Sequence, residues 1–288
     1  MTEEADLICR FVKPPGWAIA GRMSKRLTAD LASGALAEAI SDIAEDAARV
    51  ILPYWRNGVV AQVKADDSPV TLADQQAEAL ILTRLAALYP EVQAVAEEAV
   101  AADGAPTMTG DWFWLIDPLD GTRGFIEGRE SFTVNIALVH KDTVVAGVVT
   151  APATSTTWRS GPAGASPANV GAFRRRFGDA WQAIRVRDRP DAPVAVMSHS
   201  LNDADAQRLA SRYGCREWQG VDSSLKFCLI AEGRYDAYPR NGPTSEWDTA
   251  AGQAVLEAAG GRVLSEDGAP FRYGKPGFLN GGFVALGG

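Results

Sequence analysis

An apolar run that ends in two closely spaced aspartates constrains this chain most strongly. Residues 112–116 are all aromatic or aliphatic and predict a buried strand. Asp117 and Asp120 follow at once with Pro118 between them, which predicts that the strand stops abruptly in a turn. The turn would bring both carboxylates and the Leu119 carbonyl towards one point, and such oxygen clusters bind hard cations such as Mg²⁺. Taken alone, the stretch is equally typical of an ordinary polar turn.

Gly121 and Thr122 come directly after the second aspartate. If a helix begins there, its first backbone N–H groups would form a cradle for a phosphate group. A metal site and an anion site would then be adjacent, as phosphoryl chemistry requires.

The composition limits the class of protein. A chain of 288 residues that is 47% hydrophobic can bury the core of one large domain or of two ordinary ones. A net charge of −8 disfavours nucleic acid polymers as partners but permits a local basic pocket for a small anion. The first residues are acidic and no apolar run reaches transmembrane length, so we expect no secretory signal and no transmembrane segment. Cys9, Cys215 and Cys228 lack metal-ligand spacing, and we expect them to be reduced in a cytoplasmic protein.

The hydrophobic pattern predicts an α+β half followed by an α/β half. We expect an irregular leader over 1–27, an N-terminal metal-binding α+β domain over 28–155 and a C-terminal α/β domain over 190–288. The connecting segment 156–189 is rich in Pro, Gly, Ala and Arg, and there two short strands or crossing loops are equally compatible with the sequence. The expected elements are a helix from Thr28 to near Pro53, a strand over 59–64, a helix after Asp74, a strand over 92–96, a hairpin of 132–139 with 144–150, a strand over 194–197, helices over 203–213 and 223–231, a strand over 235–238 and a helix over 247–259.

Three further acidic residues stand at the edges of predicted elements. Alone, Asp74 is typical of a helix start, Glu97 of a solvated surface and Asp248 of a helix N-cap. Their joint occurrence with Asp117 and Asp120, in this order, favours a functional carboxylate cluster. Other prominent residues have structural interpretations: Arg174–Arg176 is expected to be a solvated charge run, and Trp112 and Trp114 are expected in the core.

Three ordered blocks resemble the signatures of the inositol monophosphatase superfamily of Mg²⁺-dependent, Li⁺-sensitive phosphatases. These blocks are Glu97-Glu98, residues 117–122 (DPLDGT) and residues 247–252 (WDTAAG). The resemblance extends from about residue 28 to the C-terminus and implies a layered αβαβα sandwich. Four local matches are closer to the 3′(2′),5′-bisphosphate nucleotidase branch: residues 64–71, residues 121–125 with 132–136, residues 223–228, and residues 238–240 before 242–244.

The resemblance also implies roles for individual residues. The metal ligands would be Glu97, Asp117, the Leu119 carbonyl, Asp120 and Asp248, holding two or three Mg²⁺ ions. Asp74 and Thr122 would orient and deprotonate the attacking water, and Gly121 and Thr122 would cradle the phosphate. The nucleotide and its second phosphate would be held by His199, Ser223, Lys226 and Arg240.

The substrate implied is a small phosphorylated metabolite, with adenosine 3′,5′-bisphosphate favoured. Lys226 and Arg240 support a bisphosphate, because a second phosphate needs additional cations. Inositol monophosphate or another sugar phosphate is the alternative, and a non-catalytic phosphate-binding protein is a third hypothesis. Arg123-Gly124 stands where the family more often has Lys-Glu, a departure that bears on substrate choice. The protein is expected to be a monomer or a homodimer.

Overall fold

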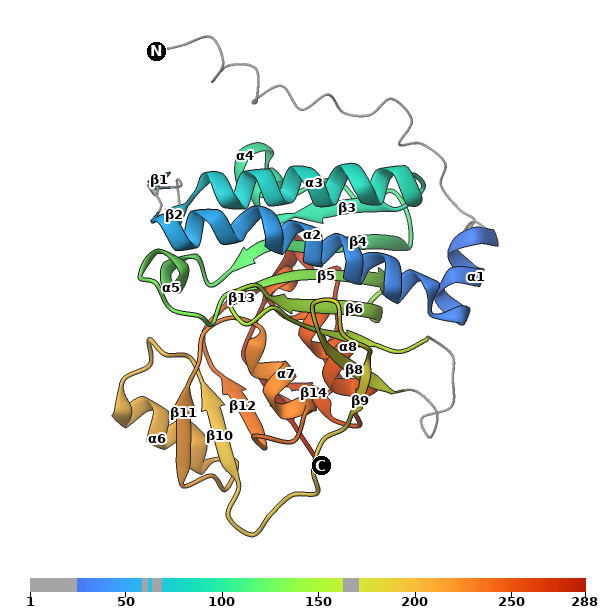
Figure 1. The fold of residues 1–288 in the computed structure, drawn as a ribbon. Coiled ribbons are helices and arrows are strands. Elements are labelled where there is room, and N and C mark those ends of the chain that lie inside the picture. Colours follow the sequence, from blue (N-terminus) through green and yellow to red (C-terminus); the bar gives the residue numbers. More distant parts are fainter. Residues whose placement is uncertain (1–24, 59–61, 64–68, 163–170) are drawn as a thin grey trace.

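The chain folds into five alternating layers of helices and sheets (Figure 1). Helices α2 (Ala35–Asn57) and α3 (Leu72–Leu88) cover one face of a seven-stranded sheet. Helices α7 (Leu225–Ala231) and α8 (Ala250–Ala258) fill the space between this sheet and a five-stranded one, and α6 (Asp203–Ser211) packs on the second sheet. The predicted αβαβα sandwich is confirmed. This computed structural model describes residues 25–58, 62–63, 69–162 and 171–288.

The larger sheet has the order β3-β4-β5-β6-β7-β8-β9. Strand β3 runs parallel to β4, and all the other neighbours are antiparallel. The predicted hairpin is present as β5 and β6. The strands are β3 (Gln93–Ala96), β4 (Trp112–Asp120), β5 (Thr133–His140), β6 (Thr143–Ala151), β7 (Thr156–Ser160), β8 (Ala172–Arg176) and β9 (Gln182–Ile184).

The segment 156–189 is therefore more than a connection between two halves. Its three strands β7, β8 and β9 extend the larger sheet at one edge. Trp158 on β7 and Ala172 on β8 are buried in the same core as α8, so this edge is covered by the C-terminal part of the chain. Arginines interrupt the apolar pattern of β7 and β8, and β9 has only three residues, so the sequence alone did not decide between strands and loops here.

The smaller sheet has the order β11-β10-β12-β16-β14, with β10 parallel to both β11 and β12. Strand β16 lies antiparallel between β12 and β14. Two-stranded pairs, β1 with β2 and β13 with β15, complete the described sheets. These strands are β1 (Gln62–Val63), β2 (Pro69–Val70), β10 (Val194–Met197), β11 (Glu217–Gly220), β12 (Ala237–Arg240), β13 (Thr244–Ser245), β14 (Arg262–Ser265), β15 (Leu279–Asn280) and β16 (Phe283–Leu286).

Strand β4 does not stop at Asp117 as the sequence predicted. Its ladder with β5 resumes at Asp120, which lies opposite Thr133, after a register shift between Asp117 and Asp120. Pro118 has no N–H to donate to the ladder, so the interruption takes the form of an irregularity within the strand rather than an end. Both aspartates consequently remain on one strand.

The first helix differs from its prediction at both ends. A separate helix α1 (Lys25–Ser33) precedes α2, and Gly34, with φ of 86°, makes the left-handed turn between them. Leu27, placed in the predicted leader, is fully buried. Helix α2 continues past Pro53 and ends at Asn57, one turn later. Residues 1–24 and most of the strand predicted over 59–64 lie outside the described residues.

Alternation along β4 divides its side chains between two cores. Trp114 and Ile116 pack on the side of α2 and α3, whereas Phe113 and Leu115 face the core that contains α8. A strand with both faces covered reads as a continuous apolar run, which is the pattern of residues 112–116. Trp114 is fully buried, and Trp112 is only half-buried at the strand's first position.

Arg175 was expected in a solvated charge run, and this prediction is wrong. Its side chain is only 13% exposed and its guanidinium donates to Glu45, Glu38 and Asp42 at 2.8, 3.0 and 2.9 Å. These three carboxylates line one face of α2 at helical spacing, so the network fastens α2 to strand β8. The sequence separation of more than a hundred residues hid this pairing. Trp181 also stacks on the guanidinium, 4.3 Å from its ring centre.

Within the described ranges, no helix is both long enough and apolar enough to cross a membrane.

The contact between α8 and β6 gives a test of the layered packing. A Cβ built on Gly147 of β6 would lie 2.7 Å from the Ala254 Cβ and 2.9 Å from the Ala251 backbone. We expect Gly147→Ala to lower the free energy of unfolding by about 1–3 kcal/mol, the usual cost of overpacking, as measured by urea denaturation. Gly110→Ala is the matched control, because nothing lies within 4 Å of its Cβ position. Equal stabilities of the two variants would contradict this packing.

Candidate active site

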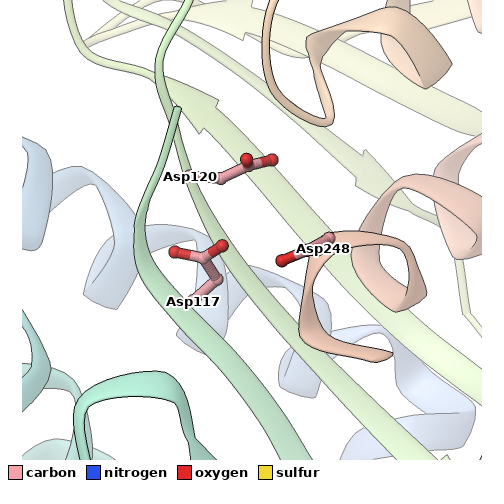
Figure 2. A group of neighbouring side chains, drawn as sticks. All are labelled: Asp117, Asp120 and Asp248. Atoms are coloured by element: carbon pink, nitrogen blue, oxygen red, sulfur yellow. The ribbon is translucent and has the colours of Figure 1, made fainter. Parts of the chain in front are cut away.

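Three aspartates from distant parts of the chain meet at one point. One carboxylate oxygen from each of Asp117, Asp120 and Asp248 lies within 4.8 Å of the other two. Figure 2 shows Asp117 and Asp120 on strand β4 and Asp248 on the turn opposite it. That turn is a short 3₁₀ helix, η1 (Glu246–Asp248), immediately before α8. The prediction that these aspartates form a cluster agrees with the geometry.

Each of these aspartates is held by backbone or side-chain donors on one oxygen. Asp117 accepts from the Leu119 N–H at 3.0 Å, and Asp248 accepts from the Ser245 N–H at 2.8 Å. Asp120 accepts from the Ser224 N–H at 2.6 Å, across the interface between β4 and the start of α7. Its second donor is the Asn135 amide at 3.3 Å. The carboxylates are thus fixed in orientation by the fold.

Burial and mutual repulsion raise the pKa of all three carboxyl groups. Asp117 has its pKa raised well above the usual value by burial and then by the charges of Glu97, Asp120 and Asp248. Burial raises the pKa of Asp120 to about 6, although Lys226 and two hydrogen-bond donors act against it. The pKa of Asp248 is raised by burial and by the charges of Asp120 and Glu97. Several hard oxygen ligands that repel one another at such short range are a donor set that fits divalent cations.

Asp74 lies beside the cluster on helix α3. Its Oδ2 accepts from the Thr71 N–H at 2.8 Å and the Thr71 hydroxyl at 2.6 Å, which completes a capping box at the helix start. Its Oδ1 lies 3.3 Å from the Thr122 hydroxyl, which also lies 3.0 Å from the Leu119 carbonyl. Burial raises the pKa of Asp74 to about 6 despite the bonds from Thr71. Asp74 is therefore both a cap and a possible proton acceptor.

Glu97 begins helix α4 (Glu97–Asp103) and lines the same cavity as Asp120 and Asp248. The residue that fixes this helix start was not predicted from the sequence. Glu78, buried on α3, accepts from the N–H groups of Glu98 and Ala99 at 2.8 and 2.9 Å. Glu78 stands one helical turn after Asp74, and that spacing was the only signal in the sequence.

A cavity of about 320 Å³ opens beside the carboxylates. Gly121 and Thr122, the predicted phosphate cradle, form part of its wall, as does Ser223. Gly121 has φ of 90°, and its Cα approaches the Ser223 side chain so closely that a Cβ would be 3.4 Å away. Four cationic side chains also line the cavity: Arg123, Arg129, Lys226 and Arg240.

Lys226 is more deeply enclosed than its predicted role suggests. It is only 3% exposed, and its ammonium donates to the carbonyls of Ser223 and Val221 at 2.6 and 3.1 Å. Burial lowers its pKa to about 8, while Asp120 acts in the opposite direction. An ammonium has three donors, so at most one remains for a ligand. Lys226 thus binds the loop before α7 as well as facing the cavity.

The other predicted nucleotide-binding residues differ in position. Arg240 lines the cavity with one long hydrogen bond, 3.3 Å, to the Pro243 carbonyl. His199 is exposed and lies beside Gly220, and in the described chain the cavity wall includes its neighbours Ser198 and Ser200 but not His199 itself. Residues 64–68 of the first nucleotidase-like match lie outside the described residues.

The cavity wall also contains an ion pair that the sequence analysis missed. The Nε of Arg129 lies 2.8 Å from Asp222 Oδ2, and both residues line the cavity. A Cβ on Gly124 would lie 3.0 Å from that Asp222 oxygen and 3.1 Å from Arg129 Nε. The glycine at position 124, noted above as a departure from the family pattern, makes room for this pair.

Known proteins resemble the chain over most of its length. The 3′(2′),5′-bisphosphate nucleotidase CysQ of Escherichia coli is 42% identical over 224 residues, which cover 76% of this chain and 86% of that protein. The protein of the same name from Buchnera aphidicola is 32% identical over 251 residues, or 85% and 91% of the two chains.

Solved structures agree with these sequence matches. CysQ from Bacteroides thetaiotaomicron superposes with a TM-score of 0.70 at 32% identity and covers 89% of this chain and 97% of that one. Inositol monophosphatase from Anabaena gives a TM-score of 0.68 at 26% identity, with 88% and 91% covered.

The fold, the acidic site and these relatives together define a phosphatase. More narrowly, the chain belongs to the inositol monophosphatase family, which matches it over residues 35–283.

The raised carboxyl pKa values predict how the stability of the metal-free protein depends on pH. In the folded state Asp74 and Asp120 have pKa values of about 6, above the unfolded value of about 4. The stabilisation of the folded state by these protonated groups is complete below pH about 4 and is lost as the pH rises through about 6. In EDTA, the free energy of unfolding should fall by about 2 kcal/mol for each of the two groups, or about 4 kcal/mol together, across this window, as measured by urea denaturation at a series of pH values.

The variant Asp120→Asn shows how much of this pH dependence of stability comes from Asp120 and how much from other groups. The variant has no carboxyl group to titrate at position 120, so its stability should fall less between pH 4 and pH 7. A wild-type pH profile in the variant would contradict the raised pKa of Asp120.

Proposed function

We propose that this phosphatase is a Mg²⁺-dependent 3′(2′),5′-bisphosphate nucleotidase, which converts adenosine 3′,5′-bisphosphate to AMP and phosphate. The observation that carries the proposal is the identity of 42% to a protein named for this activity, over 76% of the chain. The cavity supports it, because four cationic side chains line a space next to the carboxylates.

The residues proposed to hold Mg²⁺ are Glu97, Asp117, the Leu119 carbonyl, Asp120 and Asp248. Three of them lie within reach of one ion, and Glu97 lines the cavity beside them. When bound, two or three Mg²⁺ ions would supply a polarised water and stabilise charge on the phosphoryl oxygens.

The proposed role of Asp74 and Thr122 is to remove a proton from the attacking water. The Thr122 hydroxyl lies 3.3 Å from Asp74, so Asp74 can accept the proton that Thr122 takes from the attacking water. A pKa of about 6 keeps Asp74 mostly ionised at neutral pH and still basic enough to accept this proton. The backbone at Gly121 and Thr122 would hold the phosphate in line with the attacking oxygen.

We assign the second phosphate of the substrate to the cationic side chains of the cavity wall. Arg240 lines the cavity and its hydrogen bond to the Pro243 carbonyl is long, so its guanidinium can accommodate a further anion. Arg123 is exposed at the rim and has no ion-pair partner among the described residues. Lys226 would contribute its remaining donor and its charge, and Ser223 lines the same cavity.

The second candidate is hydrolysis of inositol monophosphate or another sugar monophosphate. The family and the structural similarity to the Anabaena inositol monophosphatase favour it. A substrate with one phosphate leaves Arg123 and Arg240 without an anion to bind, which makes this the weaker fit. A non-catalytic phosphate-binding protein would have no need of a buried carboxylate cluster with raised pKa values.

A substrate panel tests the proposal. Phosphate release is measured with adenosine 3′,5′-bisphosphate, inositol 1-phosphate and fructose 1,6-bisphosphate under the same Mg²⁺ concentration. We expect the highest kcat/KM for the nucleotide bisphosphate. A preference for inositol 1-phosphate would overturn the nucleotidase assignment and leave the phosphatase assignment intact.

The metal requirement is a separate prediction. Activity should disappear in EDTA, return with Mg²⁺ and fall again in Li⁺ or excess Ca²⁺. Calcium prefers longer bonds and more ligands than magnesium, so it should occupy the carboxylates in an unproductive geometry. The measurement is the rate of phosphate release across a titration of each ion, and full activity in EDTA would refute the metal assignment.

Asp120→Asn tests the carboxylate cluster itself. Loss of one metal-binding charge should lower kcat by about a thousandfold or more, which corresponds to several kcal/mol of transition-state stabilisation. The fold should persist, since asparagine can still accept the bonds from Ser224 and Asn135. Asp205→Asn on the exposed face of α6 is the control and should keep wild-type kcat. Near wild-type turnover of Asp120→Asn would show that Asp120 only shapes the turn.

A further inference from the structure

Asp248 reaches the other two aspartates from a different part of the chain. It lies on η1 at the entrance to α8, whereas Asp117 and Asp120 lie on β4. One carboxylate oxygen of each lies within 4.8 Å of the other two, so the three like charges repel one another. A local bond from the Ser245 N–H orients the Asp248 carboxylate, but it cannot set the distance between η1 and β4. Some longer-range contact must position η1.

Glu246, the first residue of η1, makes that contact. It is 0% exposed and accepts from the backbone N–H groups of Gly274 and Lys275 at 2.8 and 2.9 Å. The Lys275 ammonium also lies 2.8 Å from its Oε1. One carboxylate therefore binds two consecutive N–H groups and a cation, an arrangement that leaves little freedom of rotation.

The partner segment is itself fastened to the larger sheet. The Tyr273 N–H donates to the Asp142 carbonyl at 3.0 Å, and the Arg272 guanidinium donates to the Thr143 hydroxyl at 2.5 Å. Asp142 lies in the turn between β5 and β6, and Thr143 is the first residue of β6; β5, which ends at this turn, pairs with β4. Residues 272–275 thus form a brace, which connects the sheet that carries Asp117 and Asp120 to the turn that carries Asp248.

A second attachment lies further along the same segment. Asn280, 4% exposed, donates to the Ser245 carbonyl at 2.8 Å and lies 3.0 Å from the Thr249 hydroxyl. These two residues flank η1 on either side. The turn that carries Asp248 is therefore held at its start by Glu246 and at both flanks by Asn280.

We propose that Glu246 is a positioning residue for the metal site: its bonds to the brace hold Asp248 close to Asp117 and Asp120 and so set the affinity for Mg²⁺. This inference rests on the metal site of the proposed function. Partners that orient ligand residues without touching the ion typically change metal affinity by about ten- to a hundredfold when they are removed. The three carboxylates repel one another before the ion binds, and the brace holds them together against that repulsion.

Glu246→Gln tests the inference with little change in shape. The Gln carbonyl oxygen can accept one of the two N–H groups, but its amide nitrogen cannot accept the other, and the ion pair to Lys275 is lost. Titration calorimetry of the substrate-free protein with Mg²⁺ should show an affinity about tenfold lower than that of the wild type. The Mg²⁺ concentration for half-maximal phosphate release should rise by the same factor, while kcat at saturating Mg²⁺ stays within about threefold.

Asp236→Asn is the matched control. Asp236 is also a buried carboxylate, 3% exposed, which binds Arg187 at 2.8 and 2.6 Å and the Val194 N–H at 2.7 Å. It precedes β12 and lies outside the cavity wall, so its loss should lower the Tm without changing the Mg²⁺ affinity. If Glu246→Gln behaves in the same way, the bonds of Glu246 are only structural and the inference falls.

Lys275→Met supplies a milder variant if Glu246→Gln does not fold. It removes the ammonium but keeps both backbone bonds to Glu246, and a fall of about threefold in Mg²⁺ affinity is expected. An unchanged affinity in this folded variant would also count against the inference. The calorimetry needs no substrate. Failure of the nucleotidase assignment in the panel would therefore leave this test intact, whereas absence of Mg²⁺ binding by the wild type would overturn both.

Discussion

The structure depends on keeping like charges together in a buried place. Asp117, Asp120 and Asp248 bring carboxylate oxygens within 4.8 Å of one another, at the cost shown by their raised pKa values. Local bonds orient each carboxylate, whereas the packing of α8 on the larger sheet and the bonds of Glu246 and Asn280 act on the distance between their segments. The surrounding fold thus supplies the preorganisation that a metal site requires.

Helix α3 supports the opposite side of the site. Asp74 and Glu78, one turn apart, point one carboxylate at the Thr122 hydroxyl and the other at the first N–H groups of α4. Asp74, the proposed proton acceptor, and the helix that begins with Glu97 are consequently held by a single rigid element. A shift of α3 would move both together, which preserves their relative geometry better than two independent loops would.

The sequence predicted the local features of the fold and site better than the distant ones. Strand β4, the β5–β6 hairpin and the aspartates could be predicted, because apolar runs, alternation and motif spacing act over a few residues. Pairings such as that of Arg175 with α2 join residues far apart in the chain, so they could not be predicted from the local periodicity of the sequence. The sequence predicted a strand end at Pro118, but the structure has an irregularity there. The strand continues because the ladder with the neighbouring strand β5 resumes at Asp120, and a local pattern does not show that pairing. The roles given to single residues from the family resemblance remain predictions.

Lys226 shows why a residue type alone does not define a role. The sequence places a cation near the substrate, yet the fold buries it, directs two of its donors to loop carbonyls and sets it beside Asp120. In that position its charge offsets part of the repulsion within the carboxylate cluster. The outer cations, Arg123 and Arg240, are less committed to protein partners. Under the proposed function, recognition of a second phosphate would fall mainly to these two arginines, because an anion gains most from charges that no internal partner has already neutralised.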